Sequence, residues 1–231
     1  MSLSIVLPCF NEREAIAQTV HAVSAWMKCQ GHQGEIIVVN DGSTDSTAEV
    51  LAKLASEIPH LHIITHERNL GYGLAVRSGC DAGTCATIAF MDSDGQFDPH
   101  DFRLLLPVLK DCAFVTGRRR HRADPPLRNL FGKILGIMDV VVFGVWVRDI
   151  NCGMKAFRRS IWPAIRPTIA LEKLFNTEIF LYLKRHHIAW QQVDVPHYPR
   201  QFGQPTGGTL TIIFKMFKEV LALFRRARGH Q

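Results

Sequence analysis

Strand-like apolar segments recur at a nearly constant spacing along the first half of the chain, and this repeat constrains the fold more than any other feature. The segments begin near Ile5, Ile36, Ile63 and Ile88, so that successive starts are 31, 27 and 25 residues apart. Each interval has room for one helix and two short turns, as in β–α–β units. The repeat therefore predicts an α/β fold, with a mostly parallel sheet and helices on both of its faces.

The second half of the chain has a different pattern. A basic loop that contains prolines follows Thr116, and hydrophobic periodicity predicts helices over about 127–146 and 173–187. The alternating segment 188–196 predicts an edge strand. With 231 residues, 47% of them hydrophobic, the chain is long enough for one large domain with an appendage. We expect a main domain over 1–208 and a basic amphipathic helix over 209–231.

The composition favours a cytoplasmic protein with an anionic partner. The formal net charge is +6 and the sequence pI is about 9.1, which suits a nucleotide, a phospholipid surface or nucleic acid. The six cysteines form no CxxC pair, so we expect reduced thiols. The first residues lack the basic segment and the long apolar core of a signal peptide. The sequence also has no run of about 18 uncharged apolar residues, the length that a spanning helix needs.

Polar clusters follow three of the four predicted strands of the first half. They occupy residues 8–12, 40–43 and 92–94. In a sheet of this kind the carboxyl ends of the parallel strands share one edge, and ligands bind outside that edge. We therefore expect the three clusters to meet in one binding site.

The last of these clusters crowds carboxylates at the end of a strand that looks buried. Asp92, Asp94 and Asp98 lie within seven residues. Two carboxylates roughly 5 Å apart repel by about 3 kcal/mol at an effective dielectric of about 20, so the cluster needs a compensating cation. Mg²⁺ or Mn²⁺ held by Asp92, Asp94 and Gln96, and shared with a diphosphate, meets this need. Asp98, which precedes Pro99, is expected only to begin the next helix.

Other metal and nucleotide motifs do not fit the sequence. An EF-hand loop beginning at Asp92 would have its glycine at the fourth position instead of the sixth, and Arg103 would occupy the twelfth. The turn after the first strand lacks the GxGxxG sequence of a dinucleotide site, and the chain contains no Walker loop. These absences leave a metal-bound diphosphate as the chemistry that the carboxylates favour.

Six motifs follow one another along the chain: IVLPCFNE, VVNDGSTDST, RNLGYGLAVRSG, MDSDGQFDP, NCGMKAFRR and VPHYPRQFG. Together they resemble the family-2 glycosyltransferases, and in particular the dolichol- or polyprenol-phosphate sugar synthases, over about residues 3–210. The resemblance implies the GT-A nucleotide-sugar fold. It also implies inverting transfer of a hexose from a GDP- or UDP-linked donor to a polyprenyl phosphate at the cytoplasmic face of a membrane, with Mg²⁺ or Mn²⁺ as cofactor.

The resemblance also assigns residues to the donor side. Asp41 would hold the base or the ribose. Asp92 and Ser93 would lie along the ribose and the diphosphate, which Arg200 would also reach. A metal and an arginine at these positions would stabilise the charge of the leaving group without proton transfer. The residues implied for the nucleotide sugar are Pro8, Phe10, Glu12, Asp41, Asp92, Ser93 and Arg200, and those implied for the metal are Asp92, Asp94 and Gln96.

On the acceptor side the resemblance implies cationic anchors, because an acceptor phosphate is already an anion and needs no strong base. Arg119 and Arg128 would clamp this phosphate. Asp149 would orient Arg119 or Lys155. If the acceptor were instead the hydroxyl of a soluble sugar or a protein, Asp149 would act as the general base.

Two departures from the family pattern fall on the acceptor side, where Gly132 replaces a serine and Thr206 replaces a lysine. A lipid-linked acceptor requires access to a membrane. Apolar residues at helical spacing from Ile212 to Phe224, with lysines and arginines beside them, fit a helix on an anionic membrane surface. Packing of this helix on the core is the alternative. A membrane partner subunit is also expected, whereas nucleic acid is not expected as a partner. The intact Asp92 and Asp94 pair argues against the alternative of a non-catalytic membrane-associated subunit.

Overall fold

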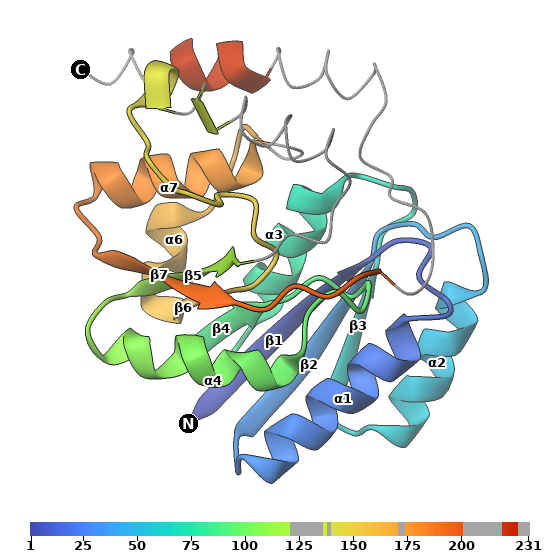
Figure 1. Ribbon diagram of the computed structural model, residues 1–231. Coiled ribbons are helices and arrows are strands. Elements are labelled where there is room, and N and C mark those ends of the chain that lie inside the picture. Colours follow the sequence, from blue (N-terminus) through green and yellow to red (C-terminus); the bar gives the residue numbers. More distant parts are fainter. Residues whose placement is uncertain (121–135, 138–139, 171–173, 201–218, 226–231) are drawn as a thin grey trace.

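The computed structural model describes residues 1–120, 136–137, 140–170, 174–200 and 219–225, which form a seven-stranded sheet flanked by helices (Figure 1). The strands are β1 (Ser2–Cys9), β2 (Gln33–Asn40), β3 (Leu61–Thr65), β4 (Thr87–Phe90), β5 (Phe114–Arg119), β6 (Lys155–Arg158) and β7 (Trp190–Val195). Their order in the sheet is β3-β2-β1-β4-β6-β5-β7. Only β6 runs antiparallel to its neighbours, so the expected mostly parallel sheet is confirmed.

Helices cover both faces of the sheet, as predicted. They are α1 (Ile16–Cys29), α2 (Thr47–Glu57), α3 (Tyr72–Ala82), α4 (Phe102–Leu105), α6 (Trp162–Ile165) and α7 (Phe175–Arg185), with 3-10 segments η1 (Pro99–Asp101), η2 (Leu106–Lys110) and η3 (Arg159–Ile161). Ile5 of β1 packs in a core with α1, α2 and α4, whereas the next residue, Val6, packs in a second core with α3, α6 and α7. Burial on both faces explains why the strands are continuously apolar.

The strand β6 brings a loop from the second half of the chain to the expected binding edge. Its first residue, Lys155, pairs with Phe90, the last residue of β4. Because β6 is antiparallel to β4, the loop over 149–154 that precedes it lies at the carboxyl end of β4. The sequence did not predict this strand, since KAFR is too short to show a strand period and has basic residues at both ends.

The helix predicted over 127–146 ends earlier than expected. Within the described residues its last helical position is Phe143, and residues 144–147 are not helical. Gly144 has a φ of 62° and its N–H donates a hydrogen bond to the Val140 carbonyl oxygen. A glycine in this left-handed conformation is a common helix terminator. Residues 121–135 and 138–139, including the predicted anchor Arg128, lie outside the described residues.

The C-terminal helix is described only over residues 219–225, where it is helical. Leu223 is buried in the same core as α7, and Glu219 Oε2 accepts a hydrogen bond from the Leu174 N–H at 3.1 Å. Leu221, on the other hand, is exposed. This segment therefore contacts the main domain, while the predicted boundary at residue 208 lies outside the described residues and stays a prediction. In the part of the chain that the structure describes, no helix is long and apolar enough to cross a membrane.

Glu178 of α7 anchors the segment 168–170, which precedes α7 in the chain. Its carboxylate is fully buried and accepts hydrogen bonds from the backbone N–H groups of Thr168, Ile169 and Ala170, at 2.9, 3.0 and 2.6 Å. The Tyr182 hydroxyl donates a further bond at 2.8 Å. One buried carboxylate thus satisfies a buried backbone donor and several partly buried donors, which makes the local fold depend on it.

The Glu178→Ala variant should lose about 3 kcal/mol of unfolding free energy, because one buried and several partly buried donors then lose their shared acceptor. Urea denaturation followed by circular dichroism measures this loss. Glu57→Ala, at an exposed position of α2, is the control and should change the same quantity by less than about 0.5 kcal/mol. Equal effects of the two substitutions would contradict the anchoring role of Glu178.

Candidate functional site

The three polar clusters meet at the carboxyl edge of the sheet, as the sequence predicted. Ser93 Oγ donates a hydrogen bond to the Pro8 carbonyl oxygen at 2.7 Å, which ties the end of β4 to the end of β1. The Asn11 N–H donates to Ser43 Oγ at 3.0 Å, and the Thr44 N–H donates to Asn11 Oδ1 at 2.8 Å. These bonds join the loops after β1, β2 and β4 into one continuous surface.

Asp41, at the end of β2, holds the loop between β3 and α3. Its Oδ1 accepts a hydrogen bond from the Leu70 N–H at 2.9 Å and lies 2.7 Å from His66 Nδ1. Its Oδ2 accepts a bond from the Gly71 N–H at 2.9 Å. The buried carboxylate therefore organises one wall of the site. Direct contact with the nucleotide stays a prediction for Pro8, Phe10, Asp41 and Ser93.

Asp92 and Asp94 extend from the loop after β4 and are held by different neighbours. Asp92 Oδ1 accepts a hydrogen bond from the Tyr72 hydroxyl at 2.9 Å. The same carboxylate lies against the bare Cα of Gly153, where a Cβ would be only 1.9 Å from Asp92 Oδ2. Asp94 Oδ1 accepts a bond from the Gln96 N–H at 3.1 Å. Both carboxylates thus have defined positions at the edge of the sheet.

This donor set fits a divalent cation that shares its coordination with a bound ligand. Among the described residues, no group of three or more His, Cys, Asp or Glu side chains could hold a metal by itself. Mg²⁺ needs only one or two carboxylates when phosphate oxygens complete its coordination. Asp92 and Asp94 meet that requirement. Gln96 donates from Nε2 to the Tyr198 carbonyl oxygen at 3.1 Å, and its predicted metal contact stays a prediction.

Arg200, the arginine expected to reach the diphosphate, lies between two carboxylates of the site. It forms an ion pair with Glu12 Oε1, and its Nη1 is 3.5 Å from Asp94 Oδ2. Burial raises the pKa of Glu12, and the positive charge of Arg200 opposes this rise. Within the described part of the chain, Glu12 Oε2 is buried without a hydrogen-bond partner. The arrangement concentrates negative charge, which a further cation would offset.

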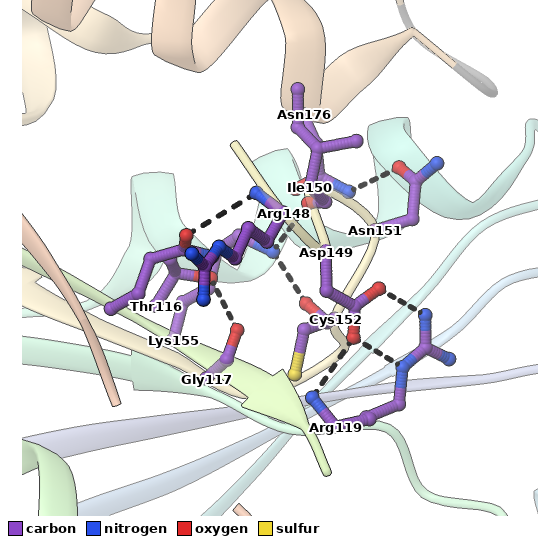
Figure 2. Close-up of polar contacts among 11 residues, drawn as sticks. Thr116, Gly117, Arg119, Arg148, Asp149, Ile150, Asn151, Cys152, Lys155 and Asn176 are labelled. Atoms are coloured by element: carbon purple, nitrogen blue, oxygen red, sulfur yellow. Dashed lines mark hydrogen bonds and ion pairs between the residues drawn. The ribbon is translucent and has the colours of Figure 1, made fainter. Parts of the chain in front are cut away.

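Arg119 and Asp149 form a bidentate ion pair near the same edge (Figure 2). Arg119 ends β5, whose carboxyl end points the same way as that of β4 because both strands are antiparallel to β6. Asp149 Oδ2 accepts bonds from Arg119 Nε at 2.8 Å and from the Arg119 backbone N–H at 3.0 Å, and Oδ1 accepts one from Nη2 at 2.7 Å. Of the two partners considered for Asp149, Arg119 is therefore the one that it contacts through these bonds.

Lys155, the other partner considered for Asp149, is a buried cation next to this pair, and the sequence did not indicate its burial. Its ammonium group donates hydrogen bonds to the carbonyl oxygens of Ile150 and Cys152 and lies 5.4 Å from the centre of the Phe90 ring (Figure 2). Burial lowers the pKa of Lys155 to about 8, against the opposing effects of the nearby Cys152 and Asp149. By holding two carbonyl groups, Lys155 shapes the loop over 149–154. A lysine within an otherwise apolar motif is the signal that could have revealed it.

An open apolar cavity borders the Arg119–Asp149 pair. Its volume is about 510 Å³, and its lining includes Asp149 together with the apolar residues Ile137, Val141 and Trp146. Val141 is 77% exposed and Trp146 is 66% exposed, which is unusual for side chains of this size. The geometry can accommodate a ligand with a charged end and an apolar body.

Gly153→Ala should displace the Asp92 carboxylate, because the added Cβ would overlap with Asp92 Oδ2. We expect Mn²⁺ binding in the presence of a nucleoside diphosphate, measured by electron paramagnetic resonance, to weaken by roughly tenfold or more. Gly136→Ala is the control, since its Cβ would meet no atom within 4 Å among the described residues. Unchanged Mn²⁺ affinity in Gly153→Ala would contradict this account of the site.

Lys155→Met should alter how stability depends on pH. The pKa of Lys155 is about 8 in the folded protein. It is about 10.4 in an unfolded chain, so the unfolded state binds more protons between these values and stability rises with pH across this window. The variant lacks this rise. As the pH increases, the unfolding free energy of the wild type should therefore increase relative to that of the variant. Urea denaturation at about pH 7 and about pH 10 measures the change, and Lys53→Met, at an exposed position, is the control. A difference in unfolding free energy between wild type and Lys155→Met that does not depend on pH would refute the prediction.

Comparison with characterised proteins places the chain among sugar transferases. The profile described as Glycosyl transferase family 2 matches residues 4–165. A dodecaprenyl-phosphate galacturonate synthase of Rhizobium johnstonii is 28% identical over 100% of this chain and 70% of its own length. An undecaprenyl-phosphate 4-deoxy-4-formamido-L-arabinose transferase of Yersinia enterocolitica is 29% identical over 96% of this chain and 67% of its own length. A dolichyl-phosphate beta-glucosyltransferase of Trichomonas vaginalis is 28% identical over 83% of this chain and 62% of its own length.

Comparison with solved structures agrees on the fold. The crystal structure of glucosyl-3-phosphoglycerate synthase from Mycobacterium tuberculosis with Mn²⁺, UDP and phosphoglyceric acid superposes with a TM-score of 0.72. The sequences are 21% identical, and the match covers 98% of this chain and 78% of the synthase chain. This likeness confirms the expected GT-A fold. Because the family profile spans more than half of its residues, the chain belongs to glycosyl transferase family 2.

Proposed function

We propose that this chain transfers a hexose from a UDP- or GDP-linked sugar to a polyprenyl phosphate, with inversion at the anomeric carbon. The observation that carries the proposal is the bidentate Arg119–Asp149 pair, whose aspartate lines an open, largely apolar cavity. A polyprenyl phosphate has the matching parts, an anionic head and an apolar chain. Three relatives whose names contain a polyprenyl or dolichyl phosphate support this class of acceptor.

On the donor side, Asp92 and Asp94 hold Mg²⁺ or Mn²⁺ together with the diphosphate of the nucleotide sugar. A metal bound there neutralises charge that develops on the leaving group. Arg200, whose guanidinium lies beside Asp94, contributes a second positive charge to the same diphosphate. Fixed cations stabilise the departing diphosphate without any proton transfer. The similar synthase was crystallised with Mn²⁺ and UDP, which is consistent with this use of the fold.

On the acceptor side, a phosphate oxygen forms a bond to the anomeric carbon as the bond from that carbon to the diphosphate oxygen breaks. Arg119 binds the acceptor phosphate, with Arg128 as the second predicted anchor. Asp149 acts as a positioning residue, because its two carboxylate oxygens hold the guanidinium of Arg119 in one orientation. This engagement of both oxygens disfavours the alternative hydroxyl acceptor, for which Asp149 would have to accept a proton as general base.

The lipid chain of the acceptor explains the exposed apolar surface. Val141 and Trp146 lie where an isoprenoid chain bound at Arg119 would continue. Arg148 lies over the Trp146 ring at 5.7 Å, so positive charge accompanies the apolar side chains, as suits an anionic membrane surface. We therefore propose a peripheral location on the cytoplasmic face of a membrane, with a membrane subunit as a further partner.

The decisive experiment separates lipid from aqueous products. Radiolabelled UDP- and GDP-sugars are incubated with the protein, Mn²⁺ and vesicles that contain polyprenyl phosphate, and the mixture is then extracted with organic solvent. Label in the organic phase is expected, and Asp94→Asn should reduce it by roughly a hundredfold because a stabiliser of the leaving group is weakened. Asp98→Asn is the matched control, since the Asp98 carboxylate accepts a bond from the His100 N–H at the start of η1 and has no predicted metal contact. Label confined to the aqueous phase would refute the lipid acceptor.

A further inference from the structure

The Tyr72 hydroxyl is directed at one of the predicted metal ligands, and the proposed reaction assigns it no role. Tyr72 is the first residue of α3, and its Oη donates a hydrogen bond to Asp92 Oδ1 at 2.9 Å. The residue as a whole is 36% exposed, but burial around the hydroxyl raises the pKa of Tyr72 well above its usual value. A tyrosine at this position is therefore not explained by burial of its ring alone.

The position of Tyr72 is fixed both through the neighbouring backbone and through its ring. On the backbone side, the preceding residues Leu70 and Gly71 donate their N–H groups to the buried carboxylate of Asp41. On the side-chain side, the Tyr72 ring packs edge-on against the buried ring of Phe175, with centroids 6.4 Å apart. The hydroxyl is thus presented to Asp92 by a segment that is itself held in place.

The Asp92 carboxylate also lies against Gly153. A Cβ at Gly153 would overlap with all three terminal atoms of Asp92, at 1.9 Å from Oδ2, 2.2 Å from Cγ and 2.6 Å from Oδ1. The terminal torsion of an aspartate is normally broad, so an unsupported carboxylate would sample many orientations. Contact with the Gly153 backbone and the hydrogen bond from the Tyr72 hydroxyl restrict that rotation.

We infer that Tyr72 is a positioning residue for metal binding, which holds the Asp92 carboxylate in the orientation that a divalent cation requires. The inference rests on the proposed function, because it takes Asp92 as a metal ligand. Hydrogen-bond partners of ligating carboxylates commonly contribute a factor of roughly 10 to 100 in metal affinity. Tyr72 acts through Asp92 and does not touch the reacting atoms.

The test compares two tyrosine variants that each lose one hydrogen bond to a carboxylate. Tyr72→Phe removes the bond to Asp92 and keeps the ring that packs on Phe175. Tyr182→Phe removes a bond of similar length, 2.8 Å, from the Tyr182 hydroxyl to Glu178. Mn²⁺ binding is titrated by electron paramagnetic resonance with UDP or GDP present, and thermal unfolding is recorded for each protein.

Tyr72→Phe should weaken Mn²⁺ binding by about tenfold, whereas Tyr182→Phe should leave the Mn²⁺ affinity unchanged. In the transfer assay, Tyr72→Phe should raise the Mn²⁺ concentration needed for half-maximal rate, with kcat largely restored at saturating Mn²⁺. This separation would not arise from a purely structural defect, which would lower thermal stability and would not be rescued by metal.

Wild-type Mn²⁺ affinity in Tyr72→Phe would overturn the inference and leave the proposed function intact. Equal weakening in both tyrosine variants would also overturn it, since the effect would then come from general destabilisation. If the wild-type protein itself fails to bind Mn²⁺ with either nucleotide, the metal is removed from the proposed function, and the inference is removed with it.

Discussion

Crowded negative charge at the carboxyl edge of the sheet is the constraint on which the rest of the site depends. Glu12 follows β1, and Asp92 and Asp94 follow β4, so the parallel pairing of these two strands brings the three carboxylates together. Partly buried carboxylates that lie close to one another raise each other's pKa values unless cations or hydrogen-bond donors compensate. Arg200 and Tyr72 provide such compensation within the protein, and a divalent cation shared with a diphosphate would complete it.

Positive charge on this edge comes from the second half of the chain because of the way β6 enters the sheet. Its antiparallel insertion between β4 and β5 places the loop over 149–154 beside the end of β5 (Figure 2). Asp149 then accepts two hydrogen bonds from the Arg119 side chain. Lys155 holds the loop by donating hydrogen bonds to the carbonyl oxygens of Ile150 and Cys152. A preorganised cation beside an apolar surface suits recognition of a phosphate that carries an apolar chain.

The cluster at the carboxyl ends of β1, β2 and β4 was predicted more completely than the neighbouring residues from the second half of the chain, for identifiable reasons. Regular strand spacing placed the carboxylates correctly, and Asp98 begins η1 as expected, accepting a hydrogen bond from the His100 N–H. The strand β6 was missed because four residues cannot display a period. The helix expected to reach Trp146 stops before Gly144, whose left-handed conformation was not evident from an apolar sequence.

The sequence by itself determined the order of strands and helices in the first half of the chain, the polar residues that follow three of those strands, and the family, because periodicity and motifs are local properties of a chain. Only the tertiary structure decided which charges meet. Arg119 and Asp149 are 30 positions apart, and Glu12 and Arg200 are 188 positions apart. No local pattern encodes such pairings, since they depend on strand order, on the direction of β6 and on how both halves of the chain pack against one sheet.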